Sequence, residues 1–223
     1  MEHKAAKQGI DFDVCKRNLL LKLSKELDKS KKGSVDAPIV DFVEYVNKTP
    51  DFCTTSSCSG RFSIFCASYD EEKSAQVSKG GKWLFVEHRV VTPEELIAKT
   101  KEELLRCKGV TLFKLEPFVL HVQCRNWEKA QEMLELAVAA GFRESGILMG
   151  RRIMLGIRTT ANSMEFPIAE NGQLLVTEEY LRYVVEYGNK KFEDNLRRIA
   201  VLFQSIREQY PLPEESAKKA RIA

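Results

Sequence analysis

Apolar residues recur at helical spacing in five segments of this 223-residue chain, and each recurrence predicts a helix. The helices are expected over residues 13–27, from about Asp36, over 93–106, over 127–140, and from Thr177 through Phe203. The start at Thr92-Pro93-Glu94-Glu95 is the clearest, because it combines a hydroxyl cap, a first-turn proline and acidic residues. The last pattern is the longest and predicts a long C-terminal helix.

Segments rich in β-branched and aromatic residues predict strands between these helices. They span residues 61–69, 83–89, 110–125, 146–149, 152–159 and 165–168, with a hairpin expected around Gly150-Arg151. Pro117 cannot donate a ladder hydrogen bond, so we expect two strands over 110–125 or one with a bulge. The stretch TTSSCSGRF, residues 54–62, carries little apolar area and predicts a turn of small residues before the first strand.

This order of elements predicts an α+β fold, with a mixed sheet and flanking helices. Residues 61–106 and 110–140 both read as two strands followed by a helix, which suggests an internal β-β-α duplication. No low-complexity linker divides the chain. We therefore expect one α+β domain over residues 1–210 and a flexible polar tail over 211–223.

Composition narrows the class of protein. The chain is 43% hydrophobic and 30% charged, which is typical of a globular protein. Its six cysteines are scattered rather than set in a dense framework, and no apolar run approaches the roughly 18 to 20 residues that cross a bilayer. These features predict a soluble cytoplasmic protein without a membrane segment. The net charge of +3 permits contact with nucleic acid without arguing for it.

Two histidines are candidates for proton transfer near neutral pH. Alternation along the strand over 110–125 puts His121, Gln123 and Arg125 on one face, which is either a solvated sheet face or a reactive one. His88 shares its strand face with Leu84 and Val86, so it is either a core histidine or a residue at a cleft. Both interpretations stay open for each histidine.

The small-residue stretch and a nearby tryptophan are candidates for ligand binding. Small residues let a backbone approach a ligand, and the Arg61 guanidinium matches a carboxylate or a phosphate. Trp83 follows a double-glycine turn and serves either as a core anchor or as a stacking surface. Cysteine and histidine spacings do not predict a metal site, and no glycine-rich fingerprint for a nucleotide follows a strand.

Six motifs occur in an order that resembles one known family. They are KGSVD (32–36), TSSCSGR (55–61), GGKWLFVEH (80–88), EPFVLHVQCR (116–125), GFRESGI (141–147) and VTEEY (176–180). Together they are similar to the tRNA wybutosine-synthesizing protein 3 family, over about residues 32–203. Glu87 departs from the family pattern, which more often has a small hydroxyl residue before the histidine.

The resemblance implies a transferase that uses S-adenosyl-L-methionine and does not have the usual Rossmann methyltransferase fold. Its implied substrate is phenylalanine tRNA whose modified guanine, next to the anticodon, carries a tricyclic ring and an aminocarboxypropyl arm. The enzyme is expected to methylate a ring nitrogen of this 7-aminocarboxypropyl-demethylwyosine. Other wybutosine-pathway enzymes are further expected partners.

With this reaction in view, the candidate residues receive expected roles. His121 is favoured over His88 as the base that accepts the ring-nitrogen proton. The cofactor is expected at Ser56, Ser57, Ser59, Gly60 and Trp83, and the substrate at Arg61, Gln123, Arg125 and Arg158. No cation should lie against the cofactor's positive sulfur, so Arg61 is expected to point away from that sulfur, whereas Trp83 is compatible as a stacking surface.

Lysines and arginines that could contact tRNA phosphates form two groups, each interrupted by acidic residues. They are Lys29, Lys31 and Lys32, and then Lys190, Lys191, Arg197 and Arg198. Two other functions stay open: a non-catalytic tRNA-binding module of the same pathway, and a hydrolase that uses the Cys58 thiol. Binding of S-adenosyl-L-methionine would argue against the first, and insensitivity to thiol alkylation against the second.

Overall fold

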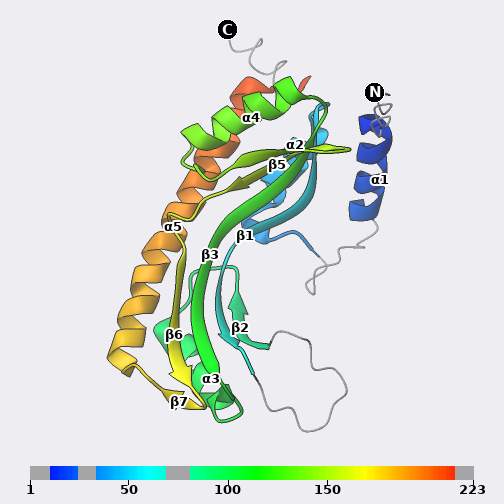
Figure 1. The fold of residues 1–223 in the computed structure, drawn as a ribbon. Helices are drawn as coiled ribbons and strands as arrows, with labels where there is room; N and C mark the ends of the chain where they lie inside the picture. Colours follow the sequence, from blue (N-terminus) through cyan, green and yellow to red (C-terminus); the bar gives the residue numbers. More distant parts are fainter. Residues whose placement is uncertain (1–10, 25–33, 69–80, 214–223) are drawn as a thin grey trace, which may run out of the picture. The chain divides into compact units, whose positions relative to one another are not determined.

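A computed structural model describes residues 11–24, 34–68 and 81–213 (Figure 1). They form two compact units. Unit 1 takes its residues from Met1–Cys58, Val119–Thr159 and Arg198–Ala223, and unit 2 from Ser59–Phe118 and Thr160–Arg197. The expected single domain over 1–210 stays a prediction, and most of the expected tail lies outside the described residues.

The predicted helices are confirmed. The described residues contain α1 (Phe12–Ser24), a 3₁₀ turn (Ala37–Ile39) that leads into α2 (Val40–Lys48), α3 (Pro93–Leu104), α4 (Trp127–Ala139) and α5 (Glu178–Gln209). At the start of α3, Thr92 Oγ1 accepts from the Glu95 N–H at 3.2 Å, and the Glu95 carboxylate accepts from the Thr92 N–H at 2.6 Å. This capping box satisfies two backbone groups and fixes where α3 begins.

The strands form an antiparallel sheet. They are β1 (Phe52–Cys66), β2 (Lys82–Glu87), β3 (Val110–Cys124), β4 (Gly146–Met149), β5 (Ile153–Arg158), β6 (Met164–Glu170) and β7 (Gln173–Leu174). Their order is β2-β1-β3-β5-β4, with β6 also beside β3 and β7 beside β6. The α+β class is confirmed, and antiparallel pairing excludes a doubly wound Rossmann sheet. The elements β1, β3 and α5 each contribute residues to both units.

The small-residue stretch is part of a strand, so the expected turn is wrong. Residues 54–62 lie in the middle of β1, which runs without a break from Phe52 to Cys66. Thr54 is buried, and its backbone N–H donates to the Asn47 side chain at 2.8 Å. Serine and threonine favour turns because their hydroxyls form hydrogen bonds with nearby backbone groups. In β1 the hydrogen-bonding groups of these residues are instead engaged by α2 and by a neighbouring strand. Tertiary pairing overrides the local preference.

Pro117 lies inside a single continuous strand rather than between two strands. β3 pairs with β6 over residues 110–115 and with β5 over residues 119–124. Residues 116–118 therefore fall where β3 changes partner on that side. The missing N–H of Pro117 costs no hydrogen bond to β5 or β6 there, which is why the strand tolerates a proline.

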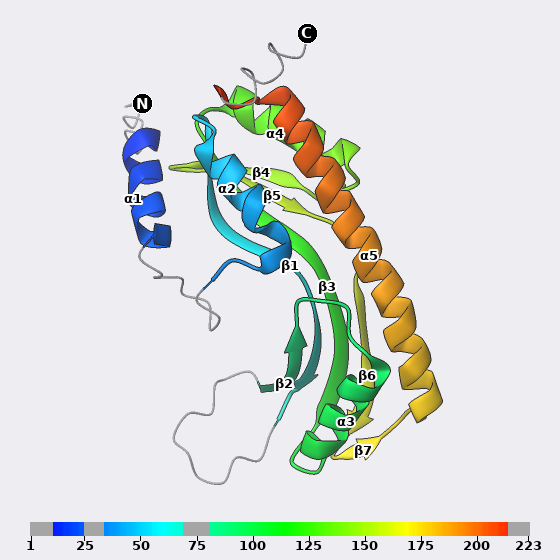
Figure 2. The same cartoon turned by 180° about the vertical axis from the view of Figure 1, so that it is seen from behind.

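In unit 1, one face of the sheet is buried and the other carries polar residues. Leu120 and Val122 of β3 are fully buried, as are Leu155 and Ile157 of β5. α4 packs against β4 and β5, and Phe42 of α2 stacks on a phenylalanine of α5 with ring centroids 5.2 Å apart. Figure 2 shows α2 and α5 over this side of the strands.

In unit 2, α3 and the first half of α5 contribute to one core. Phe62 and Phe113 are fully buried there, with Leu96 of α3 and Val185 of α5 in the same cluster. One face of β1 and of β3 is therefore buried in this core. Trp83 of β2 lies outside it and is 39% exposed.

None of the six cysteines, all of which lie in the described residues, forms a disulfide bond. Among the described residues, no helix combines the length and the apolar character needed to span a membrane.

Candidate functional site

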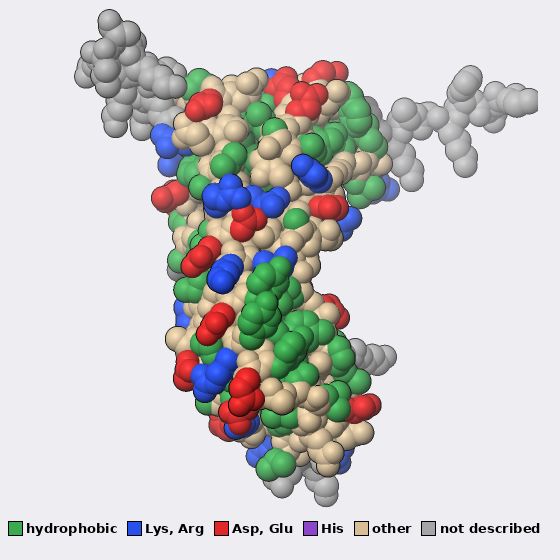
Figure 3. Space-filling view, turned by 90° about the vertical axis from the view of Figure 1, so that its left-hand side faces the viewer, with side chains coloured by type: hydrophobic (Ala, Val, Ile, Leu, Met, Phe, Trp, Pro, Cys, Tyr) green, Lys and Arg blue, Asp and Glu red, His purple; other side chains and the backbone are tan. Residues whose placement is uncertain are grey.

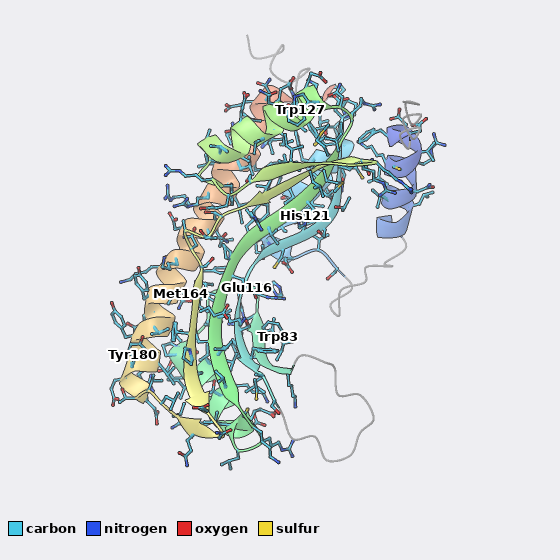
Figure 4. The ribbon with its side chains drawn as sticks, viewed as in Figure 1. Trp83, Glu116, His121, Trp127, Met164 and Tyr180 are labelled. Carbon is cyan, nitrogen blue, oxygen red and sulfur yellow. The ribbon has the colours of Figure 1, made fainter. Side chains whose placement is uncertain are left out.

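In unit 1, β3 presents His121 on the face opposite its buried neighbours Leu120 and Val122. The imidazole is exposed, and its Nδ1 lies 2.8 Å from Oγ of Ser56 on β1. Oγ1 of Thr55 donates to the backbone oxygen of His121 at 3.2 Å. Figure 4 shows His121 on β3. The Ser56 contact orients the imidazole at the surface, a geometry suited to proton transfer.

Two glycines lie next to His121 in the sheet, one on each of the next two strands. His121 pairs with Gly156 of β5, and Gly156 pairs in turn with Gly146 of β4. A Cβ placed on Gly156 would lie 3.5 Å from Cδ2 and 3.7 Å from Nε2 of His121, whereas one on Gly146 would meet nothing within 4 Å. One row of the sheet thus carries an imidazole followed by two positions without side chains.

The expected polar row His121, Gln123 and Arg125 is exposed only in part. Gln123 is 2% exposed, and its Oε1 is buried with no hydrogen-bond partner among the described residues. A buried oxygen without a partner is costly. The strand alternation correctly predicted that His121 is exposed, whereas Gln123 is buried. The role of Gln123 in substrate binding stays a prediction.

Arg125 is held by its own chain. Its Nε donates to Asp51 at 2.8 Å, its terminal nitrogens donate to both oxygens of Asp13 at 2.8 and 3.0 Å, and one of them also donates to the Pro50 carbonyl at 2.9 Å. The guanidinium lies 4.6 Å from the ring centre of Phe12. These hydrogen bonds, that to Asp13 foremost, raise the pKa of Arg125. A substrate role would require this network to open and stays a prediction.

Arg158 and Ser57 are the other expected ligand-binding residues of unit 1. Arg158 is exposed at the end of β5, and its Nε donates to the Glu144 carbonyl at 3.1 Å. Ser57 is half-buried on β1. Their expected roles stay predictions.

Unit 2 holds a second polar cluster, built from β1, β2 and β3. Nε of Arg61 donates to the Glu116 carboxylate at 2.6 Å, and the guanidinium lies 4.9 Å from the ring centre of Trp83. Phe65 also packs against Trp83, with ring centroids 4.8 Å apart. Figure 4 labels Trp83 and Glu116. Arg61 lies over the indole because the electron-rich ring face attracts the cation. The expectation that Arg61 points away from the cofactor's sulfur stays a prediction.

Ser59 and Gly60 are buried, and contacts within the chain leave no room for a side chain at Gly60. A Cβ on Gly60, whose φ is +104°, would lie 3.0 Å from the Glu116 carbonyl and 3.1 Å from Nδ2 of Asn195. The Asn195 amide donates to the Ser59 carbonyl and accepts from the Phe118 N–H, both at 2.8 Å. Asn195 thus bonds backbone groups of β1 and β3. A cofactor role for Ser59 or Gly60 stays a prediction.

His88 lies in the bend after β2 and is half-buried. β2 ends at Glu87, and its pairing with β1 is irregular between Ile64 and Phe65. The expected shared face is therefore not formed: Leu84 is 5% exposed, whereas Val86 is 38% exposed. His88 is not on a regular strand face, and its role as an alternative base stays a prediction.

The expected phosphate-binding cations are only partly in view. Lys29, Lys31 and Lys32 lie outside the described residues. In the second group, Arg198 donates to the Gly141 carbonyl at 3.1 Å and Lys191 donates to the Ala161 carbonyl at 3.0 Å. Figure 3 shows hydrophobic side chains next to mixed positive and negative charges on one face, rather than a continuous basic area.

Several residues of these clusters received no role from the sequence, among them Glu116, Asn195 and Gly156. Glu116 is the first residue of the EPFVLHVQCR motif, and its acidic side chain next to Pro117 is a signal that the sequence contains. Nothing in the sequence marks Gly156, because its place beside His121 follows from strand register.

Comparisons with known proteins identify the family of this chain. The family model "Methyltransferase TYW3" matches residues 15–208. The chain belongs to this family. It is 42% identical over 178 residues to "tRNA wybutosine-synthesizing protein 3 homolog" of Xenopus laevis, covering 79% of this chain and 68% of the relative. It is 37% identical over 192 residues to the Homo sapiens protein of the same name, covering 85% and 70%. The predicted family is confirmed.

Solved structures of similar proteins carry the same fold. "Structure of PH1069 protein from Pyrococcus horikoshii" superimposes with a TM-score of 0.76 at 30% identity, covering 88% of this chain and 96% of that one. A hypothetical protein from Aeropyrum pernix superimposes with a TM-score of 0.63 at 19% identity, covering 78% and 98%. As a member of a methyltransferase family of wybutosine synthesis, the chain is a tRNA methyltransferase.

Proposed function

We propose that this protein uses S-adenosyl-L-methionine to methylate a ring nitrogen of 7-aminocarboxypropyl-demethylwyosine in phenylalanine tRNA. Family membership supports the transfer of a methyl group to tRNA, and the curated relatives are named for wybutosine synthesis. The observation that carries the chemical part is the exposed His121 imidazole with its Nδ1 2.8 Å from Ser56 Oγ. Wybutosine-pathway enzymes are further proposed partners, and the cytoplasm is the proposed location.

The reaction needs a group that takes a proton. The acceptor ring nitrogen carries a hydrogen in the demethylated base, so it becomes a better nucleophile as that hydrogen leaves. Imidazole has a pKa near neutrality and is the commonest general base in proteins. His121 is exposed on a strand and hydrogen-bonded through one ring nitrogen, which suits this role.

The reaction also needs groups that recognise an α-amino acid. S-adenosyl-L-methionine ends in an ammonium and a carboxylate on one carbon, and so does the aminocarboxypropyl arm of the substrate. In unit 2, Arg61 and Glu116 offer the complementary pair of charges 2.6 Å apart, both partly exposed. The guanidinium suits the carboxylate, and the Glu116 carboxylate suits the ammonium.

The neighbouring tryptophan limits how a cofactor can bind. S-adenosyl-L-methionine supplies a methyl group on a positively charged sulfur. Because the Arg61 guanidinium lies over the Trp83 ring at 4.9 Å, this indole face suits a carboxylate-bearing group or a neutral ring and does not suit the sulfonium. The residues present fit the amino-acid end of the cofactor, which Arg61 and Glu116 would hold.

The proposed function is tested with purified protein, isotope-labelled S-adenosyl-L-methionine and phenylalanine tRNA from cells that lack this activity. Mass spectrometry of the digested nucleosides should show one added methyl group on the tricyclic base. His121→Ala should lower the turnover by about 10² to 10⁴ at saturating substrates, the usual contribution of a general base. Retained tRNA binding without methyl transfer or cofactor binding would contradict the proposal and indicate a non-catalytic module.

A further inference from the structure

The two ring nitrogens of His121 have different surroundings. Nδ1 is hydrogen-bonded to Ser56 of β1 at 2.8 Å. Nε2 lies on the opposite side of the ring, toward β5, where it would be 3.7 Å from a Cβ on Gly156. A reacting group that uses this imidazole therefore meets Nε2, because Ser56 already engages Nδ1.

The tautomer decides whether Nε2 can accept a proton. A neutral imidazole has one protonated nitrogen and one with a lone pair. If the Ser56 hydroxyl donates to Nδ1, Nε2 carries the hydrogen and cannot act as a base. If Nδ1 carries the hydrogen and donates it to Ser56 Oγ, Nε2 has the lone pair. The partner of one ring nitrogen commonly sets the state of the other in this way.

Gly156 keeps the space beside Nε2 free of a side chain. Its φ lies outside the left-handed region, so its backbone does not require glycine. A methyl group there would make ordinary van der Waals contacts with the imidazole, so alanine should be accommodated. An alanine methyl group would instead fill space above the sheet. This space lies between His121 and Gly146, which flank Gly156 on the two neighbouring strands.

We propose that Ser56 is a positioning residue that holds His121 with its hydrogen on Nδ1, and that the planar substrate base approaches Nε2 over Gly156. This proposal rests on the proposed function, in which His121 is the base. The N–H bond of the ring nitrogen breaks, Nε2 takes the proton, and the electron pair left on the ring nitrogen forms the bond to the transferred methyl group. The methyl donor keeps the electron pair of the bond that is lost. The imidazolium then releases its proton to water.

The first test reads the tautomer without any reaction. Nitrogen-15 NMR of the imidazoles, recorded above the pH at which they titrate, distinguishes the two neutral forms. The chain has three histidines, so the His121 signals are those that disappear in His121→Gln. We expect the Nδ1–H form in the wild type and a shift toward the Nε2–H form in Ser56→Ala. A wild type in the Nε2–H form, or no change in Ser56→Ala, would overturn the role of Ser56.

The second test measures turnover. Ser56→Ala should lower kcat by about 10-fold with little change in KM, and Ser56→Thr should restore most of it, as expected when a positioned base loses its orientation. Thr55→Val is the matched control, because Thr55 bonds the backbone of His121 and not the ring. Its kcat should stay within about 2-fold of the wild type. An equal loss in both variants would assign the effect to the strand and contradict the proposal.

The third test addresses the approach over Gly156. Gly156→Ala should lower kcat/KM for tRNA by about 10-fold and leave the affinity for S-adenosyl-L-methionine unchanged, and Gly156→Val should lower it further. Gly150→Ala, in the turn between β4 and β5, is the control and should match the wild type. Unchanged kcat/KM in both Gly156 variants would overturn the approach. A wild type that transfers no methyl group would instead refute the proposed function, while the NMR result would still decide the tautomer.

Discussion

Arg61 and Arg125 belong to similar-looking clusters in different units of the molecule. Each guanidinium lies over an aromatic ring, at 4.9 and 4.6 Å, and each pairs with a carboxylate. Their side chains are also almost equally exposed, at 32% and 34%. Exposure and partner type therefore do not distinguish a ligand-binding arginine from a structural one.

The segments that each arginine connects do distinguish them. Arg125 joins α1, through Asp13, and the turn before β1, through Asp51, to the end of β3. Arg61 and Glu116 instead lie on strands of one sheet that backbone pairing already holds together. Loss of Arg125 should thus affect stability first, and loss of Arg61 should affect ligand binding first.

The largest effect is expected for Arg61→Ala. Removing the guanidinium should lower kcat/KM about 100-fold, which corresponds to roughly 2.7 kcal/mol of lost transition-state stabilisation, because an α-amino acid carboxylate loses its partner. Steady-state methyl transfer measures this value. Arg182→Ala, which removes an exposed arginine of α5 in the same unit, is the control and should retain wild-type kinetics. Wild-type kcat/KM in Arg61→Ala would remove the arginine from ligand binding and end the comparison.

Arg125→Ala should show the opposite pattern. Loss of two ion pairs and a carbonyl hydrogen bond at a partly solvated position should lower the free energy of unfolding by about 1–2 kcal/mol. For the folded fraction, kcat/KM should stay within about 3-fold of the wild type. Urea denaturation followed by circular dichroism measures the stability, with Arg17→Ala on exposed α1 surface as control. Unchanged stability together with a large kinetic loss would make Arg125 the ligand-binding arginine.

Local features of the fold could be predicted from the sequence, whereas contacts between distant segments could not. The helices were predictable because their signals are local, as in the capping box of Thr92 and Glu95. Residues 54–62 were mistaken for a turn because their strand partner lies far along the chain. The sequence pointed to Ser56 and His121 separately, but their contact depends on which residues of β1 and β3 lie side by side. Gly156 was missed for the same reason.

A smaller effect is expected for Glu116→Gln, which keeps the size of the side chain and removes its charge. If Glu116 binds an α-ammonium group, affinity for that group should fall about 10-fold. Calorimetry with S-adenosyl-L-methionine and the KM for tRNA identify its source, because only the molecule that carries the bound ammonium should be affected. Unchanged values for both would leave Glu116 as a structural partner of Arg61, and the contrast with Arg125 would weaken.

The smallest effect concerns the pH dependence of the Arg125 cluster. The hydrogen bond from Arg125 lowers the pKa of the Asp13 carboxyl below its ordinary value of 3.8. A depressed pKa in the folded state means that the stabilisation is fully present above the unfolded-state value and is lost as pH falls through the folded-state value. Wild type should therefore be more resistant to urea than Asp13→Asn at about pH 7, and the two midpoints should converge as the pH falls below about 4. Midpoints that stay equally far apart at low pH would show that the charge of Asp13 does not hold Arg125, and the distinction from Arg61 would then rest on Pro50 and Asp51 in the turn before β1.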